Sequence, residues 1–252
     1  MVKTLEVVLA PPELGALARR DLSAACCVVL DVLRATTTMV TALANGAQAV
    51  VPVAEIPDAL ELRARHPGVL LAGERDGVRI LAALTGGADF DLGNSPREFT
   101  PQRVRGRTIV MTTTNGTRAL RACAGAGRVL VGALLNLGAV ARAIEQACPA
   151  SLVIVCSGTL EQAAYEDTLA AGALCDLVWP LYAEGQVADS ALIARGVYQK
   201  ERGNLLEAIQ SGRNGRRLSR RPELRDDVAL CAQRDAVDLV AQLLPDGQVR
   251  RV

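Results

Sequence analysis

Histidine and lysine are almost missing from this chain of 252 residues, which contains one histidine and two lysines. A zinc site built from two or three histidines is therefore excluded. A Ser-His-Asp triad would have to use His66, which lies in a segment that resembles a helix end. Neither Lys3 nor Lys200 stands in the G-x-x-x-x-G-K-[ST] pattern, so the sequence has no phosphate-binding P-loop.

Aromatic residues and an excess of charge of one sign are also scarce. Phe, Trp and Tyr make up 2% of the residues, and 28 Lys and Arg against 27 Asp and Glu leave a formal charge of +1. Platforms that stack bases need aromatic rings, and nucleic-acid binders usually carry a clear basic excess. We therefore expect no nucleic-acid partner.

The seven cysteines form no C-x-x-C pair, and none is followed six positions later by an arginine, so the loop of the thiol phosphatases is missing. Several cysteines lie in apolar runs, which favours buried, reduced thiols. The first residues lack the basic flank and long apolar core of a signal peptide, and no apolar run is long enough to cross a membrane. These features predict a cytoplasmic protein without a membrane partner.

Half of the residues are apolar, which is enough for a sizeable core. Short, continuous apolar runs alternate with segments of helical spacing, and continuous apolar strands are typical of parallel sheets covered on both faces. The pattern predicts an α/β fold with three αβα layers around a mostly parallel sheet. We expect strands over 27–30, 49–53, 69–72, 108–111, 129–132 and 152–156, and helices over 37–45, 56–65, 117–123, 137–148 and 168–179.

The C-terminal third has a different pattern. Helical spacing extends over 189–210 and 227–244, and we interpret the arginine-rich segment 212–226 between them as a basic loop. No linker divides the chain, so we treat residues 1–252 as a single unit, with 105–150 as the region where a subdivision could fall. Hydroxyl-rich turns follow three of the strands, which is compatible with two similar βα halves or with ordinary helix capping.

Polar residues gather directly after the expected strands, where ligands bind in open α/β sheets. Carboxylates with few histidines favour a hard cation such as Mg²⁺. Helix N-termini and hydroxyl groups bind phosphate oxygens, and arginines pair with phosphate or carboxylate groups. The combination predicts metal-assisted chemistry on a small anionic phosphate ester. The carboxylates in these turns are those of Asp31, Glu74, Glu166 and Asp167.

Parts of this pattern have simpler interpretations. The stretch 112–117 could be a strand end and a helix N-cap, and Asn115-Gly116 could form a hairpin turn, although the residues that follow favour a helix. Glu166 and Asp167 could only complement a helix dipole. Asp31 is different, because a carboxylate that follows four apolar strand residues needs partners or a cation. We place Asp31 at the centre of the site, and both the nucleophile and the metal-ligand role remain open.

The polar blocks occur in an order that resembles one known family. Asp-Val-Leu-Arg-Ala-Thr-Thr-Thr begins at Asp31, and Gly-Glu-Arg, Gly-Asn-Ser-Pro, Thr-Thr-Thr-Asn-Gly-Thr and Glu-Asp-Thr follow in order. From about residue 27 to about residue 244 the chain resembles the 2-phosphosulfolactate phosphatase family. The resemblance implies a Mg²⁺-dependent phosphatase. Its substrate would be (2R)-2-phospho-3-sulfolactate or a related phosphorylated 2-hydroxy acid, and the step would belong to coenzyme M biosynthesis.

The resemblance also implies roles for individual residues. Catalysis would fall to Asp31, Arg34 and Thr36. Mg²⁺ would be bound by Asp31, Glu74, Glu166 and Asp167. The substrate would be bound by Arg75, Asn94, Ser95, Thr112, Thr113, Thr114, Asn115, Gly116 and Arg118. Arg34 is the first candidate for the anionic groups of the substrate, because it shares a turn with Asp31. Asp76 stands where we expect a glycine in relatives.

Two other functions are compatible with the same residues. A haloacid-dehalogenase-type aspartyl phosphatase needs a second carboxylate two positions after the first, but Leu33 stands there, and the Asp89-Phe90-Asp91 segment follows no apolar strand. A non-catalytic anion-binding α/β protein would use the same turns without turnover. The expected partner is a small anionic phosphate ester, and a homodimer is left open.

Overall fold

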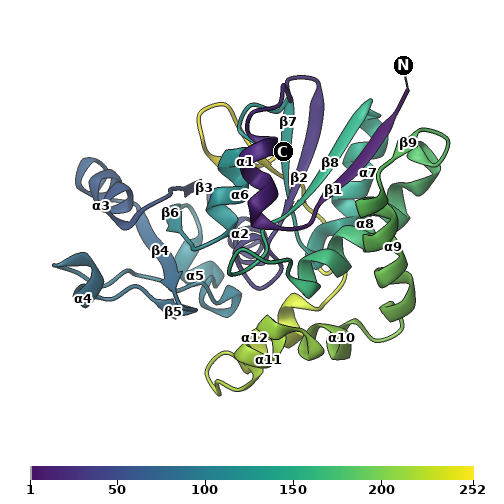
Figure 1. Ribbon diagram of the computed structural model, residues 1–252. Helices are drawn as coiled ribbons and strands as arrows, with labels where there is room; N and C mark the ends of the chain where they lie inside the picture. Colours follow the sequence, from purple (N-terminus) through teal and green to yellow (C-terminus); the bar gives the residue numbers. More distant parts are fainter. Residues whose placement is uncertain (1) are drawn as a thin grey trace.

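The computed structural model describes residues 2–252, and their strands form one 11-stranded sheet (Figure 1). The strands are β1 (Thr4–Val8), β2 (Ala25–Leu30), β3 (Ala49–Pro52), β4 (Leu70–Arg75), β5 (Val78–Arg79), β6 (Thr108–Thr112), β7 (Arg128–Gly132), β8 (Ser151–Cys156), β9 (Gln186–Val187), β10 (Ala241–Leu243) and β11 (Val249–Arg251). The α-helices are α1 (Leu14–Leu17), α2 (Ala35–Ala44), α3 (Ile56–Arg65), α4 (Ala82–Thr85), α5 (Pro101–Val104), α6 (Gly116–Ala122), α7 (Leu137–Ala147), α8 (Tyr165–Tyr182), α9 (Asp189–Glu201), α10 (Leu205–Ser211), α11 (Arg213–Ser219) and α12 (Arg225–Cys231).

The residues of β2 show that helices cover both faces of the sheet. All of them are buried. Cys26 and Val28 belong to a core cluster with α7 and α8, whereas Cys27 and Val29 belong to a second cluster with α2 and α6. Successive side chains of a strand point to opposite faces, so the two clusters lie on opposite sides of the sheet. The predicted three-layer αβα architecture is confirmed.

The parallel strands fall into two groups that run in opposite directions. One group is β7-β2-β8-β1-β9 and the other is β4-β6-β3. The β10–β11 hairpin lies between them, with β10 antiparallel to β7 and β11 antiparallel to β3. These three antiparallel steps reverse the strand direction three times, so the groups oppose each other. The predicted mostly parallel sheet is confirmed, but its division into two opposed groups was not predicted.

The predicted strands and helices between residues 25 and 182 are all present, with ends that differ by at most three residues. The interpretation of 212–226 as a loop is wrong, because 213–219 form α11, a helix fixed by packing. Leu218 is buried, and a Cβ on Gly215 would lie 1.9 Å from the Ile209 carbonyl oxygen, so α10 and α11 touch backbone to backbone.

Two further predictions for the C-terminal third need correction. The helix predicted over 189–210 is interrupted after Glu201, and Asn204 starts α10 by accepting a hydrogen bond from the backbone amide of Glu207. The helix predicted over 227–244 ends at Cys231, and 241–243 form strand β10. Pro245-Asp246-Gly247 is a turn sequence, and Gly247 has a φ of +79° in the hairpin that follows β10. Among residues 2–252, no helix combines the length and the apolarity needed to span a bilayer.

Candidate active site

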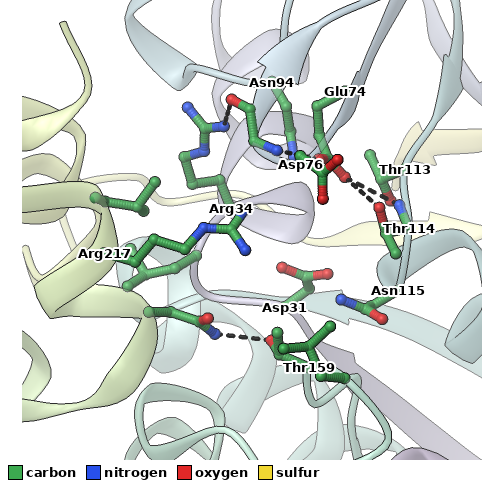
Figure 2. A pocket seen from close by; sticks show the side chains of 15 residues that line it. Asp31, Arg34, Glu74, Asp76, Asn94, Thr113, Thr114, Asn115, Thr159 and Arg217 are labelled. Carbon is green, nitrogen blue, oxygen red and sulfur yellow. Dashed lines mark hydrogen bonds between the residues drawn. The ribbon is translucent and has the colours of Figure 1, made fainter. Parts of the chain in front are cut away.

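A cavity of about 630 Å³, counted with its open mouth, lies where the carboxyl ends of both strand groups meet (Figure 2). The turns after β2, β6 and β8 and the end of β4 contribute to its wall, and α11 completes it. The lining residues are Asp31, Leu33, Arg34, Glu74, Asp76, Gly77, Asn94, Thr113, Thr114, Asn115, Thr159, Leu160, Asn214, Arg217 and Leu218. Turns that follow strands of both groups, β2 and β8 in one and β4 and β6 in the other, therefore line the same cavity.

Asp31 follows β2 directly and lies at the centre of this cavity (Figure 2). Its Oδ1 accepts a hydrogen bond from the backbone amide of Ala35 at 3.0 Å. The Thr36 hydroxyl fixes the same turn, because it donates to the Asp31 carbonyl oxygen and accepts from the Asp31 amide. Among residues 2–252 nothing donates to Asp31 Oδ2, and a Cβ on Gly116 would lie only 2.8 Å from that oxygen. One carboxylate oxygen is therefore held, and the other is available to a ligand.

The surroundings of Asp31 disfavour its charged form. Burial raises the pKa of Asp31 to about 7, and the negative charges of Glu74 and Glu166 act in the same direction. The hydrogen bond from Ala35 and the positive charge of Arg34 lower this pKa, but they do not cancel the effect of burial. A cation or ligand donors beside Asp31 would relieve this cost, and carboxylates in such surroundings are concentrated at functional sites.

Glu74 connects two of the turns that form the wall. Its Oε2 accepts from the Gly77 amide at 2.7 Å, and its Oε1 accepts from the amide and the hydroxyl of Thr114, each at 3.0 Å. Asp76 and Gly77 form a two-residue β4–β5 hairpin in which both have positive φ, +54° and +80°. Asp-Gly suits such a turn, since Asp tolerates the left-handed conformation that otherwise favours the glycine expected at this position.

Asp167 and Glu166 begin α8 and do not line the cavity. The two carboxylate oxygens of Asp167 accept hydrogen bonds from the amides of Val32 (2.8 Å) and Gly158 (3.0 Å), which ties the turn after β2 to the turn after β8. Glu166 Oε1 accepts from the Asn214 side chain at 2.6 Å, and its buried Oε2 has no partner among the described residues. Burial raises the pKa of both carboxyl groups.

Arg34 lines the cavity, but other parts of the protein hold its guanidinium. Nη1 lies 2.7 Å from Oδ2 of Asp227, and Nη2 donates to the Gly77 carbonyl oxygen at 2.7 Å. Asp227 is fully buried and also accepts from the Ser95 hydroxyl and from Nε of Arg97, each at 2.7 Å. Sequence reasoning missed Asp227, because an acidic residue in the first turn of a helix resembles an ordinary dipole partner.

Two polar oxygens in the lining are left without partners. Asn94 Oδ1 and Thr113 Oγ1 are buried, and neither makes a hydrogen bond with residues 2–252. Buried polar atoms in native proteins are almost always paired, by protein or by a bound species. Both atoms belong to residues that line the cavity beside Asp31. These two oxygens are therefore free to contact a species bound in the cavity.

Residues 15–245 match the family model described as 2-phosphosulpholactate phosphatase. This chain belongs to the 2-phosphosulfolactate phosphatase family. A relative from Caldanaerobacter subterraneus is 40% identical over 235 residues, which cover 92% of each chain. A relative from Symbiobacterium thermophilum is 38% identical over 231 residues, which cover 91% of this chain and 95% of the relative. Both are named "Probable 2-phosphosulfolactate phosphatase", and the family resemblance expected from the sequence is confirmed.

Five of the nine predicted substrate-binding residues, Arg75, Ser95, Thr112, Gly116 and Arg118, lie outside the cavity lining and contact protein instead. Arg75 donates to the Glu74 carbonyl oxygen and to the Thr112 hydroxyl, and Thr112 donates to the Ala54 carbonyl oxygen. Arg118 is exposed and pairs with Glu161 at 2.7 Å. Ser95 contacts Asp227, as described above. The cavity does contain Asn94, Thr113, Thr114 and Asn115, and Gly116 packs against Asp31.

Mg²⁺ is the cation expected from the family resemblance. Within residues 2–252 no three His, Cys, Asp or Glu side chains gather as a ligand group, so Glu166 and Asp167 do not join Asp31 and Glu74 in one shell. Mg²⁺ often takes only one or two carboxylates and completes its shell with water and substrate phosphate. The free Oδ2 of Asp31 and the unpartnered Oδ1 of Asn94 are hard oxygen donors of this kind, so the cavity fits Mg²⁺.

Proposed function

We propose that this protein hydrolyses the phosphate monoester of (2R)-2-phospho-3-sulfolactate to sulfolactate and inorganic phosphate. One observation carries the proposal. In a chain of this phosphatase family, the carboxylate of Asp31 presents one unbonded oxygen to a cavity whose wall also contains guanidinium groups and hydroxyl groups. Each of these features suits a small, densely charged phosphate ester.

The reaction replaces the bond from phosphorus to the C2 oxygen by a new bond to a water oxygen, and the leaving alkoxide takes up a proton. Asp31 would serve either by attacking phosphorus, which gives an aspartyl phosphate that water then hydrolyses, or by holding the cation. Mg²⁺, held by Asp31 and Asn94, would neutralise charge on the phosphate oxygens. Arg34, fixed by Asp227 and by the Gly77 carbonyl oxygen, lines the same cavity and would contribute positive charge.

The test is phosphate release from a panel of esters by wild-type protein and by Asp31→Asn. We expect phosphosulfolactate to be the best substrate and Asp31→Asn to lose at least about 100-fold in turnover, as for groups that act directly on the transition state. Asp226→Asn is the control, since Asp226 is exposed and outside the cavity lining. Trapping of a phosphorylated peptide that contains Asp31 would select the nucleophile role.

Two results would contradict the proposal. The first is the absence of phosphate release from every phosphorylated 2-hydroxy acid in the presence of Mg²⁺, which would favour a non-catalytic anion-binding protein. The second is an Asp31→Asn variant within threefold of wild type. A haloacid-dehalogenase-type mechanism has less support, because Leu33 occupies the position of its second carboxylate and the chain belongs to a different family.

A further inference from the structure

Arg217 reaches the cavity from α11, and one face of this helix forms part of the cavity wall. Asn214, Arg217 and Leu218 all line the cavity, and their spacing of three and four residues places them on the same side of the helix. In Figure 2 the Arg217 guanidinium extends toward Asp31, on the side opposite Thr114 and Asn115. The sequence offered a signal in this spacing, but the arginine-rich composition concealed it.

The backbone that carries Arg217 is held firmly. The Asn214 side chain donates to the Thr159 hydroxyl at 2.7 Å and to Glu166 Oε1 at 2.6 Å. Leu218 is buried, and the close approach of Gly215 to the Ile209 carbonyl leaves no room for α11 to shift toward α10. The exposed side chain of Arg217 therefore starts from a fixed point at the cavity mouth.

Arg217 differs from Arg34 in what its guanidinium contacts. Both η nitrogens of Arg34 are engaged by Asp227 and by the Gly77 carbonyl. Arg217 is the one arginine of the lining whose guanidinium makes no hydrogen bond or ion pair within residues 2–252. An incoming anion thus has to displace no protein partner from Arg217.

The charges of the cavity lining explain why an anionic substrate would need the Arg217 guanidinium. The lining contains three carboxylates, Asp31, Glu74 and Asp76, and two guanidiniums, of which Arg34 is already paired with Asp227. A net charge of +1 for the chain provides no strong long-range attraction for an anion. A substrate with several negative groups therefore depends on local cations, and Arg217 is the one in the lining without a protein anion.

We propose that Arg217 binds the second anionic group of the substrate, its carboxylate or sulfonate, and so selects phosphorylated 2-hydroxy acids over simple alkyl phosphates. The inference rests on the proposed function, because it assigns a specificity-determining residue to the same site. The planar fork of a guanidinium donates two parallel hydrogen bonds to the oxygens of such groups, whereas an ammonium offers a point charge. The phosphate is left to the Asp31 side of the cavity.

The kinetic test compares wild type, Arg217→Gln and Arg220→Gln on phosphosulfolactate, 2-phospholactate and isopropyl phosphate. Arg220 is the matched control, because it lies three residues further on, is exposed, and does not line the cavity. We expect Arg217→Gln to lower kcat/KM on phosphosulfolactate by about 10- to 150-fold, the equivalent of one charge-assisted hydrogen bond, with most of the change in KM. Arg217→Lys should recover only part of the loss.

The ratio of kcat/KM values on different esters identifies the contacted group. In Arg217→Gln the ratio of phosphosulfolactate to isopropyl phosphate should fall at least about 10-fold. A similar fall for phospholactate would assign the carboxylate, and a fall confined to phosphosulfolactate would assign the sulfonate. Equal losses on all three esters, or losses equal to those of Arg220→Gln, would overturn the proposal.

A binding measurement separates this inference from the proposed function. Sulfolactate carries the second anionic groups but no phosphate, so its binding can be followed by calorimetry without turnover. We expect Arg217→Gln to weaken sulfolactate binding at least about 10-fold and Arg220→Gln to change it less than twofold. If wild type hydrolyses none of the esters, the proposed function fails while this comparison still tests Arg217. Equal sulfolactate affinity in wild type and Arg217→Gln would refute the role of Arg217.

Discussion

Asp227→Ala should strongly destabilise the protein, although Asp227 follows Asp226 in an acidic first turn of α12 that looks solvent-exposed in the sequence. The Asp227 side chain has no exposed surface, and Arg34, its main partner, has 3% of its side chain exposed. Breaking a buried ion pair by removing one member leaves the other charge without compensation, which costs about 3–5 kcal/mol. That is a large share of the 5–15 kcal/mol by which folded proteins are ordinarily stable.

The neighbouring residue provides a matched control. Asp226 also pairs with an arginine, Arg97, but at 3.4 Å and with 66% of the Asp226 side chain exposed. Exposed pairs of this kind contribute about 0–1 kcal/mol, so Asp226→Ala should change the free energy of unfolding little. The double variant Arg34→Met/Asp227→Ala removes both buried charges, and it should be more stable than Asp227→Ala alone by about 2 kcal/mol.

Urea unfolding measures these differences. Far-ultraviolet circular dichroism and the fluorescence of the single tryptophan, Trp179, should give coincident transitions if unfolding is two-state. We expect the midpoint for Asp227→Ala to fall well below the midpoint for Asp226→Ala, with similar slopes. If the two single variants differed by less than about 1 kcal/mol, the view that the buried Arg34–Asp227 pair organises this side of the site would be refuted.

Chelation with EDTA should abolish phosphate release and added Mg²⁺ should restore it, whereas full activity after exhaustive chelation would exclude a metal requirement. In Gly116→Ala the new Cβ would lie 2.6 Å from Ala35 Cβ and 2.8 Å from Asp31 Oδ2. The variant should therefore lower kcat/KM at least about 10-fold and the free energy of unfolding by about 1–3 kcal/mol. Unchanged kinetics would show that the turn shifts without cost. Among residues 2–252 Cys148 is the one exposed cysteine, and burial raises the pKa of thiols such as Cys26 to about 12. Ellman's reagent should therefore modify about one thiol per native chain and none in Cys148→Ser, and two rapid equivalents would contradict this.

The alternating strands and helices could be predicted because their signals are local. A short run such as the one around Val28, apolar on both faces, is typical of a strand buried between two layers of helices. The helices α10, α11 and α12 have seven residues each, too few to be stable alone, so packing determines them and composition does not reveal them. The reversal between the two strand groups depends on the β10–β11 hairpin. It could not be predicted, because the apolar periodicity of 227–244 indicated a helix there.

The candidate site could be predicted only in part. Asp31 stood out because a carboxylate at the end of an apolar strand is costly without a partner. Asp167 was assigned to the same metal site only by the family resemblance, yet its two oxygens accept backbone hydrogen bonds from Val32 and Gly158, a role that depends on tertiary structure. Asp227 and Arg217 come from the C-terminal helices. The spacing of Asn214, Arg217 and Leu218 is compatible with one helix face, but nothing in the sequence places that face beside Gly77 or Asp227 beside Arg34.

The position of the β10–β11 hairpin has a consequence for synthesis on the ribosome. Its strands occupy the middle of the sheet, between β7 and β3, although they comprise residues 241–251. While these residues are still inside the ribosome, the two groups of strands share no paired edge, and each group exposes backbone donors and acceptors where the hairpin will later insert. A nascent chain therefore carries two open sheet edges until the hairpin emerges, and protection by chaperones matters most in that interval.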